Sequence, residues 1–141
     1  MPTTTSNLAT DLRRALGRAH RRLRQEVGEA GVSYAQYSVL TVLVREGPLT
    51  PGRLAERERV QPPTMTRTVN CLAELGLVTK TADPRDGRQV VVALTPAGEA
   101  EVKETRRRRD AWLTTRLARL TPDDRGVLAR AARLLEEVAA S

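Results

Sequence analysis

The sequence has 141 residues and a formal net charge of +7, a balance that favours a polyanionic partner, either nucleic acid or an acidic membrane surface. With one histidine, one cysteine and no paired-carboxylate motif, it has almost no material for hydrolytic or metal chemistry, so we expect no enzyme, no metal site and no cofactor. Two tyrosines, one tryptophan and no phenylalanine are too few rings for a protein that stacks single-stranded bases.

The N-terminal segment MPTTTSN lacks the basic-then-apolar layout of a secretion signal. No apolar run in the sequence approaches the roughly 18 to 20 residues of a membrane span. We therefore expect a cytoplasmic protein without a membrane partner. The single cysteine, Cys71, excludes an internal disulfide.

The first predicted element is an amphipathic helix from Leu8 to about Glu29, which Gly28 and Gly31 bring to an end. Its apolar residues keep helical spacing and are interleaved with arginines. The apolar positions are Leu8, Leu12, Ala15, Leu16, Ala19, Leu23 and Val27, and the arginines are Arg13, Arg14, Arg18, Arg21, Arg22 and Arg24. A basic amphipathic helix can lie on a membrane. A narrow stripe that contains alanine suits packing against another helix better, and we favour packing.

Two helices are predicted next, each from its own start signal. Ser33 with Gln36 three residues later forms a capping box. The helix that follows has a broad apolar side typical of deep burial, made by Tyr37, Val39, Leu40, Leu43 and Val44. Gly47 and Pro48 end this helix. Thr50 before Pro51 then opens a short third helix, because the threonine can cap it and the proline suits its first turn.

The stretch from Gln61 to Gly76 predicts a recognition helix. Met65, Val69 and Leu72 recur at i, i+4 and i+7, so one side of this helix is apolar and packs on a core. The opposite side offers hydroxyl, amide and guanidinium groups, which can read base edges and phosphates. Its residues are Pro63, Thr64, Thr66, Arg67 and Asn70. Together with the third helix this makes a helix-turn-helix; an ordinary surface helix is the alternative.

A β-hairpin is predicted after this helix. Residues 77–81 and 89–94 are rich in β-branched side chains, and the Pro/Asp/Gly cluster from Asp83 to Arg88 separates them. We expect Arg85 and Arg88 at its tip to enter a minor groove, where guanidinium groups are favoured. Asp83 and Asp86 would orient the two arginines through charge-assisted hydrogen bonds. The alternative is a solvated turn held by its own ion pairs.

Two further helices are predicted at the C-terminal end. Thr95–Pro96 starts a helix that runs to about Leu120, with Ala100, Thr105, Trp112, Leu113 and Leu117 as core candidates. Its run of four arginines, residues 106–109, is typical of a solvated face, with phosphate contact as the alternative. Thr121–Pro122 opens the last helix. The long amphipathic helices at both ends have more apolar surface than a small core can cover, which predicts a partner, most simply a second copy.

The order of these elements resembles the MarR family of transcriptional regulators over nearly the whole chain. The resemblance is carried by PTMTRTVNCLAELGLV, by DPRDGRQVVVALT, and within them by Asp83, Arg85 and Arg88, followed by Leu94–Thr95 and Gly98. It implies a mainly α (α+β) fold, a winged helix-turn-helix within a single MarR-type domain, residues 1–141. Residues 33–94 would form the DNA-binding region, and residues 8–32 and 95–141 the dimerisation helices.

The resemblance also implies a function. A homodimer would bind a palindromic operator in double-stranded DNA, with two recognition helices in successive major grooves and both wings in minor grooves. It would act as a repressor that a small phenolic or lipophilic anion relieves. The paired prolines 62 and 63 replace the family's usual cap residue, and Cys71 stands where a basic residue is frequent. The oxidation-sensing branch has its reactive cysteine near the N-terminus, where this chain has none, so peroxide sensing is disfavoured.

His20, Tyr34, Tyr37 and Trp112, with nearby arginines, are the candidate residues of an anion-accepting ligand crevice. The alternative is that they are ordinary core aromatics with an exposed histidine.

Two other functions compete with the repressor. Residues 50–88 carry seven basic against five acidic residues, so most of the net charge lies outside the reading segment. Scattered arginines favour an architectural, weakly sequence-selective DNA-coating protein, which would show a steep salt dependence with little sequence preference. A protein-docking module of the same fold is the other alternative.

Overall fold

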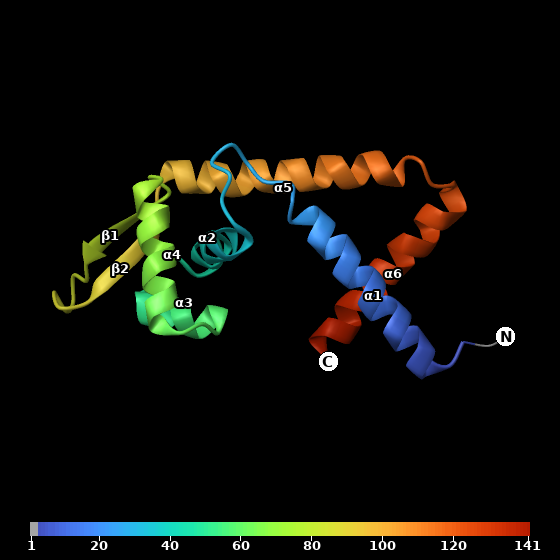
Figure 1. Ribbon diagram of the computed structural model, residues 1–141, viewed down its shortest axis with the longest axis horizontal. Coiled ribbons are helices and arrows are strands. Elements are labelled where there is room, and N and C mark those ends of the chain that lie inside the picture. The colour runs from blue at the N-terminus through green and yellow to red at the C-terminus, as the bar shows by residue number, and fades with distance from the viewer. Residues whose placement is uncertain (1–2) are drawn as a thin grey trace.

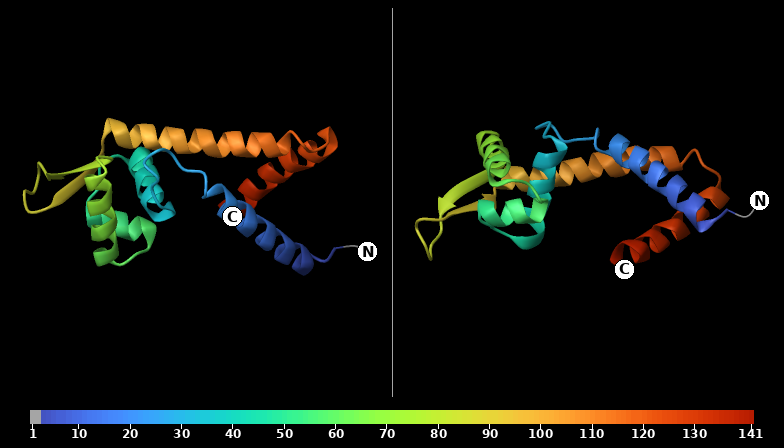
Figure 2. Two further views of the ribbon diagram at one scale, coloured as in Figure 1. Left: turned by 45° about the horizontal axis from the view of Figure 1, so that its top comes forward. Right: turned by 60° about the horizontal axis from the view of Figure 1, so that its bottom comes forward.

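The computed structural model describes residues 3–141 as six helices and one β-hairpin (Figure 1). Along the chain they are α1 Thr5–Leu23, α2 Tyr34–Glu46, α3 Pro51–Glu58, α4 Pro62–Glu74, β1 Val78–Ala82, β2 Val90–Leu94, α5 Pro96–Leu117 and α6 Pro122–Ala140. Helices α2 to α4 and the hairpin form a winged-helix lobe, residues 34–94, at one end of the molecule. Helix α5 runs from this lobe to the opposite end, where α1 and α6 cross (Figures 1 and 2). The predicted fold class is confirmed.

Most helices begin where the sequence predicts, because a side chain caps the first turn. Ser33, Thr50, Thr95 and Thr121 each accept a hydrogen bond from the backbone amide three residues later, at 3.0–3.2 Å. Gln36 returns a bond to the Ser33 amide, which completes the predicted capping box. Such caps depend only on neighbouring residues, so they can be predicted from sequence.

Helix α1 differs from its prediction at both ends. It begins at Thr5, because Thr4 caps it by accepting a hydrogen bond from the Asn7 amide at 3.1 Å. It ends at Leu23, whereas the helical spacing predicted a continuation to about Glu29. Beyond Leu23 the backbone bonds to side chains of α5 and leaves the helical path; the amide of Gly28, for example, donates to Thr105 Oγ1. Tertiary bonds therefore override the local pattern.

The hydrophobic core lies within the winged-helix lobe and under the first half of α5. Its most deeply buried side chains come from α2, α3, α4, β2 and α5, and include Leu40, Leu54, Met65, Leu72, Val92 and Val102. Helices α1 and α6 contain no buried residue. No helix within residues 3–141 is long and apolar enough to cross a membrane.

The core predicted for α5 is only partly correct. Thr105 is buried, whereas Trp112 and Leu117 are half-buried, and Ala100 and Leu113 are exposed. The buried residues of α5 lie in its first half, where the winged-helix lobe covers it. The apolar side chains of its second half extend beyond the lobe, which explains why they have no core to enter.

The junction between α4, the hairpin and α5 is tightly built. Gly76 ends α4 in the left-handed region (φ 76°), as predicted. Thr95 donates its hydroxyl to the Gly76 carbonyl at 2.7 Å while it caps α5. Gly98 packs so closely on the backbone of Leu77 that a β-carbon would overlap the Leu77 carbonyl. These contacts explain the Leu-Thr-x-x-Gly pattern physically: it sets the wing and α5 at a defined angle to α4.

Candidate nucleic-acid interface

Helix α4 has two sides of opposite character, as the sequence predicts. Met65, Val69 and Leu72 are at most 2% exposed and attach the helix to the core. The predicted reading residues all lie on the exposed side: Pro63, Thr64, Thr66, Arg67 and Asn70. Within the described residues 3–141, Arg67 has no carboxylate within 4 Å. Its guanidinium is therefore available to bind a base or a phosphate.

The first turn of α4 lacks the free backbone N–H groups that can bind an anion at the start of most helices. Pro62 and Pro63 have no N–H, and the next amide, Thr64, already donates to the Gln61 carbonyl at 3.0 Å. Gln61 makes no side-chain cap. Any phosphate contact here must come from side chains such as Thr64 or Arg67, helped only by the helix dipole.

The hairpin forms the predicted wing. Strands β1 and β2 pair antiparallel from Val78 opposite Leu94 to Ala82 opposite Val90. Arg85 and Arg88 lie exposed in the loop between them. Leu49 adds an isolated bridge to Val92, which anchors the wing to the segment between α2 and α3.

The aspartates of the wing act differently from the prediction. Asp83 accepts a hydrogen bond from the backbone amide of Arg85 at 2.9 Å, and Asp86 from that of Arg88 at 3.1 Å. Among residues 3–141, neither carboxylate forms an ion pair with the guanidinium groups. An aspartate side chain reaches the amide two residues ahead with little loss of freedom, which favours these local turns. The aspartates shape the loop and leave both arginine side chains free.

Lys80 is a candidate interface residue that the sequence reasoning missed. Its ammonium group on β1 donates to Asn70 Oδ1 on α4 at 2.5 Å. This contact joins the reading side of α4 to the wing and adds a positive charge between them. The sequence could have predicted that Lys80 is exposed, because it lies in one strand of a two-stranded sheet. It could not have predicted the contact with Asn70, because strand alternation does not show which residue of α4 lies nearby.

The arginine run, residues 106–109, is mostly engaged within the protein. Arg107 and Arg108 bind Glu104 at 2.7 and 2.9 Å. These hydrogen bonds, of which that from Arg107 has the largest effect, lower the pKa of Glu104 to about 2. Arg108 and Arg109 also donate to the carbonyls of Val27 and Glu26. The run is therefore neither a uniformly solvated face nor a free phosphate patch.

The four predicted ligand residues lie near the end of α1, the start of α2 and in the second half of α5. His20 contacts Tyr34 edge to face, with ring centroids 5.3 Å apart. Arginine side chains cover the rings: Arg24 lies over Tyr34, Arg109 over Tyr37, and both Arg22 and Arg116 over Trp112, at 4.4–4.8 Å. Among residues 3–141, the buried atoms Trp112 Nε1 and Arg109 Nη2 have no hydrogen-bond partner.

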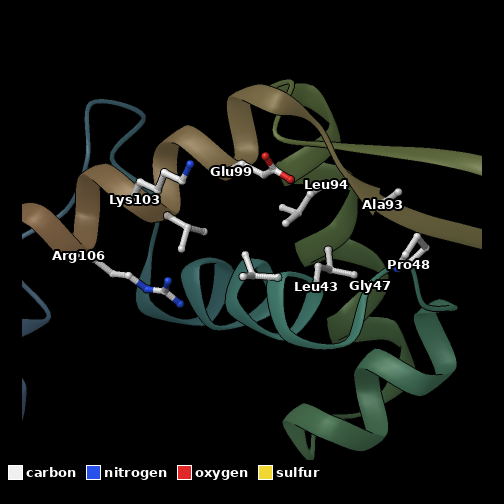
Figure 3. Close-up of a pocket in the computed structure, with 10 residues that line it drawn as sticks. Leu43, Gly47, Pro48, Ala93, Leu94, Glu99, Lys103 and Arg106 are labelled. Atoms are coloured by element: carbon white, nitrogen blue, oxygen red, sulfur yellow. The ribbon is translucent and has the colours of Figure 1, made fainter.

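A cavity of about 460 Å³ lies between α2 and α5 beside the end of β2 (Figure 3). We call it the α2–α5 cavity. Its walls are largely apolar, with Leu43, Leu94 and Val102 among them, and Lys103, Arg106 and Glu99 add charge. Arg106 extends from α5 towards α2 (Figure 3). The sequence reasoning missed this cavity, because its walls bring residues 43–48 together with residues 93–106, two segments far apart in the chain.

Comparison with known proteins assigns the family. A model of the MarR family matches residues 30–89, and a helix-turn-helix-type transcriptional regulator of Mycobacterium leprae is 46% identical over 94% of this chain and 93% of its own length. The chain belongs to the MarR family. As a MarR-family protein it is a DNA-binding transcriptional regulator with a winged helix-turn-helix.

Solved structures agree with this assignment. A transcriptional regulator of Pseudomonas aeruginosa is 32% identical with a TM-score of 0.83, and the match covers 98% of both chains. The PcaV transcriptional regulator of Streptomyces coelicolor, solved in complex with its natural ligand, is 28% identical with a TM-score of 0.60, over 99% of both chains. The MarR fold therefore extends over α1, α5 and α6 as well as the winged-helix lobe.

The wing aspartates give a first test. Replacing both, as Asp83→Asn with Asp86→Asn, keeps an oxygen acceptor for each backbone amide and removes two negative charges near DNA. We expect DNA affinity, measured by fluorescence anisotropy, to be unchanged or higher. Asp83→Ala with Asp86→Ala removes two hydrogen bonds of about 0.5–1.5 kcal/mol each, and we expect roughly tenfold weaker binding. Equal weakening in both double variants would instead indicate carboxylate–guanidinium pairing.

Proposed function

We propose that this MarR-family chain is a homodimeric repressor that binds a palindromic operator in the cytoplasm and is released by a small anionic ligand. The contact between Lys80 and Asn70 carries the DNA-binding part, because it sets the reading side of α4 beside the wing. Pro63, Thr64, Thr66, Arg67 and Asn70 would read a major groove. Arg85 and Arg88 would enter the adjacent minor groove, with Asp83 shaping their loop.

The dimensions of α4 suit this proposal. Its 13 residues correspond to a length of roughly 20 Å, and apart from Arg67 the exposed reading side chains are short, so the helix can lie deep in a groove about 12 Å wide. The arginines at the wing tip are free to follow the narrower groove, where the potential of DNA is most negative.

The proposed homodimer rests on apolar surface at the end opposite the wing. Leu8, Leu12 and Leu16 of α1 and Val127, Leu128, Leu134 and Val138 of α6 are all at least 38% exposed. An apolar groove of about 570 Å³ runs between the two helices. Exposed apolar patches of this kind mark interfaces. A second copy is the simplest partner, and its twofold symmetry would match a palindrome.

The proposal of repression and its relief is supported by this arrangement. A dimer gripping two successive major grooves would compete with other proteins for the same promoter DNA. The α2–α5 cavity has a volume within the range of small-molecule sites, and its apolar walls with Lys103 and Arg106 suit a phenolic or lipophilic carboxylate. PcaV, a relative of the same fold, binds a natural ligand. His20, Tyr34, Tyr37 and Trp112 form a second candidate site, in which Arg109 Nη2 and Trp112 Nε1 would donate to the anion.

Sequence-specific reading is tested with an operator selected from randomised duplexes. We expect Arg67→Ala to lose about 1–3 kcal/mol of binding to the operator and little to random DNA. Arg88→Ala should weaken both similarly and reduce the salt slope by about 1. The control is Arg130→Ala, which removes an exposed arginine of α6. Equal losses on operator and random DNA in Arg67→Ala would favour the architectural alternative, and no binding at low salt would favour a protein-docking module.

The homodimer is tested by introducing a charged residue into the apolar surface of α1 and α6. Leu12→Glu places a carboxylate in the apolar groove, so we expect sedimentation equilibrium to show mainly monomer where the wild type is a dimer. Leu75→Glu, at an exposed leucine of the winged-helix lobe, should leave the dimer intact. A dimer that survives Leu12→Glu would place the interface elsewhere.

Salicylate serves as the probe for ligand release. In calorimetry we expect Arg106→Ala to weaken salicylate binding about tenfold if the carboxylate occupies the α2–α5 cavity, because a charged hydrogen bond is lost. Trp112→Leu should then change little. The reverse pattern would assign the ligand to the cluster around Trp112. No heat, together with no release of DNA, would refute a salicylate-like effector.

A further inference from the structure

The segment between α1 and α2, residues 24–33, is held by one stripe of α5; we call this segment the connector. The stripe consists of Glu101, Thr105, Arg108 and Arg109. Their spacing of four, three and one residues places them on one side of the helix. Glu101 and Thr105 are 6% and 0% exposed and Arg108 and Arg109 are half-buried, and all four side chains contact the backbone of the connector.

Each side chain of the stripe bonds a different connector residue. The amide of Ala30 donates to Glu101 Oε2 at 3.2 Å, and that of Gly28 to Thr105 Oγ1 at 3.0 Å. Arg108 Nη1 donates to the Val27 carbonyl at 2.8 Å, and Arg109 Nε to the Glu26 carbonyl at 3.2 Å. The order along α5 thus runs opposite to the order along the connector. The two acceptors meet amides and the two donors meet carbonyls.

Gly28 allows this close approach. It is buried, and a β-carbon at this position would overlap the carboxylate of Glu101. Gly28 does not have a positive φ angle. Close packing therefore explains the presence of a glycine here better than backbone conformation does. A larger residue would displace Glu101 and open the stripe at its N-terminal end.

The orientation of α1 depends heavily on the connector. Helix α1 has no buried residue, and its end is otherwise attached through ring contacts such as those of His20 with Tyr34 and of Arg22 with Trp112. Such contacts at partly exposed sites contribute little each. The four bonds to the connector, two of them made by buried acceptors, are the stronger attachment.

We propose that the stripe and the connector form a latch that sets the angle between α1 and the winged-helix lobe, and through it the separation of the two recognition helices. This proposal rests on the homodimer proposed above, in which α1 lies at the interface. Glu101, Thr105, Arg108 and Arg109 are then positioning residues that contact no DNA. They select operators by the distance between half-sites, whereas α4 selects them by base sequence.

The single cysteine allows a direct measurement. Cys71 is exposed on α4, so a spin label there reports one distance between the two recognition helices of a dimer. We expect a narrow distance distribution in the wild type. It should broaden at least twofold in Thr105→Val, which removes one acceptor at constant size, and in Gly28→Ala. Arg107→Gln is the matched control, because Arg107 lies on the same helix but bonds Glu104 and leaves the connector untouched.

A binding assay with unlabelled protein separates positioning from general loss of stability. The wild type should discriminate against operators whose half-sites are one base pair closer or farther apart. We expect Thr105→Val and Gly28→Ala to lose at least threefold of this discrimination while binding a single half-site with unchanged affinity. Destabilisation alone would weaken binding to all these DNAs together. In the Glu101→Ala background the effect of Gly28→Ala should shrink, because the overlapping carboxylate is gone.

The outcomes distinguish the latch from the homodimer. A dipolar signal whose width is the same in the wild type, Thr105→Val and Gly28→Ala, with spacing discrimination retained, would overturn the latch and leave the dimer standing. A wild-type protein that gives no dipolar signal would refute the homodimer and the positioning role together.

Discussion

The packing of Met65, Val69 and Leu72 against the core is the constraint on which the interface depends. These side chains are almost completely buried, so α4 cannot rotate about its axis without exposing them to water, at about 1.5–3 kcal/mol each. The side with Arg67 and Asn70 must then face solvent. Gly76, Thr95 and Gly98 carry this orientation over to the wing and to α5. A hydrophobic contact thus determines where the polar groups lie.

The features that sequence could predict are those determined by near neighbours. Caps such as Ser33 and Thr95 act over three residues, and the apolar stripe of α4 follows from helical spacing alone. The features that it missed depend on distant partners. Thr105, Arg108 and Arg109 bond connector residues 77 to 83 positions away, and these bonds end α1 early and engage much of the arginine run. No local pattern contains such pairings, and the same is true of the α2–α5 cavity.

The arginines of this chain serve more than one purpose. Arg22, Arg24, Arg109 and Arg116 lie over aromatic rings, and others, such as Arg57, Arg107 and Arg125, bind carboxylates or carbonyls of the same chain. A net charge of +7 therefore overstates the attraction that DNA would feel at the reading surface. The reading surface proposed above uses Arg67, Arg85 and Arg88, with Lys80 beside them. Such economy suits selective binding better than indiscriminate coating of a polyanion.

Helix α5 is an uninterrupted rod of 22 residues, roughly 33 Å long. One end packs on the wing, and the other lies near α1 and α6 (Figure 1). Because the helix is long, a small tilt produces a large displacement of its far end. A tilt of about 6° at one end displaces the other by roughly 3.4 Å, the rise of one base pair. Movements too small to disturb the core could therefore shift a recognition helix by a whole step along the duplex.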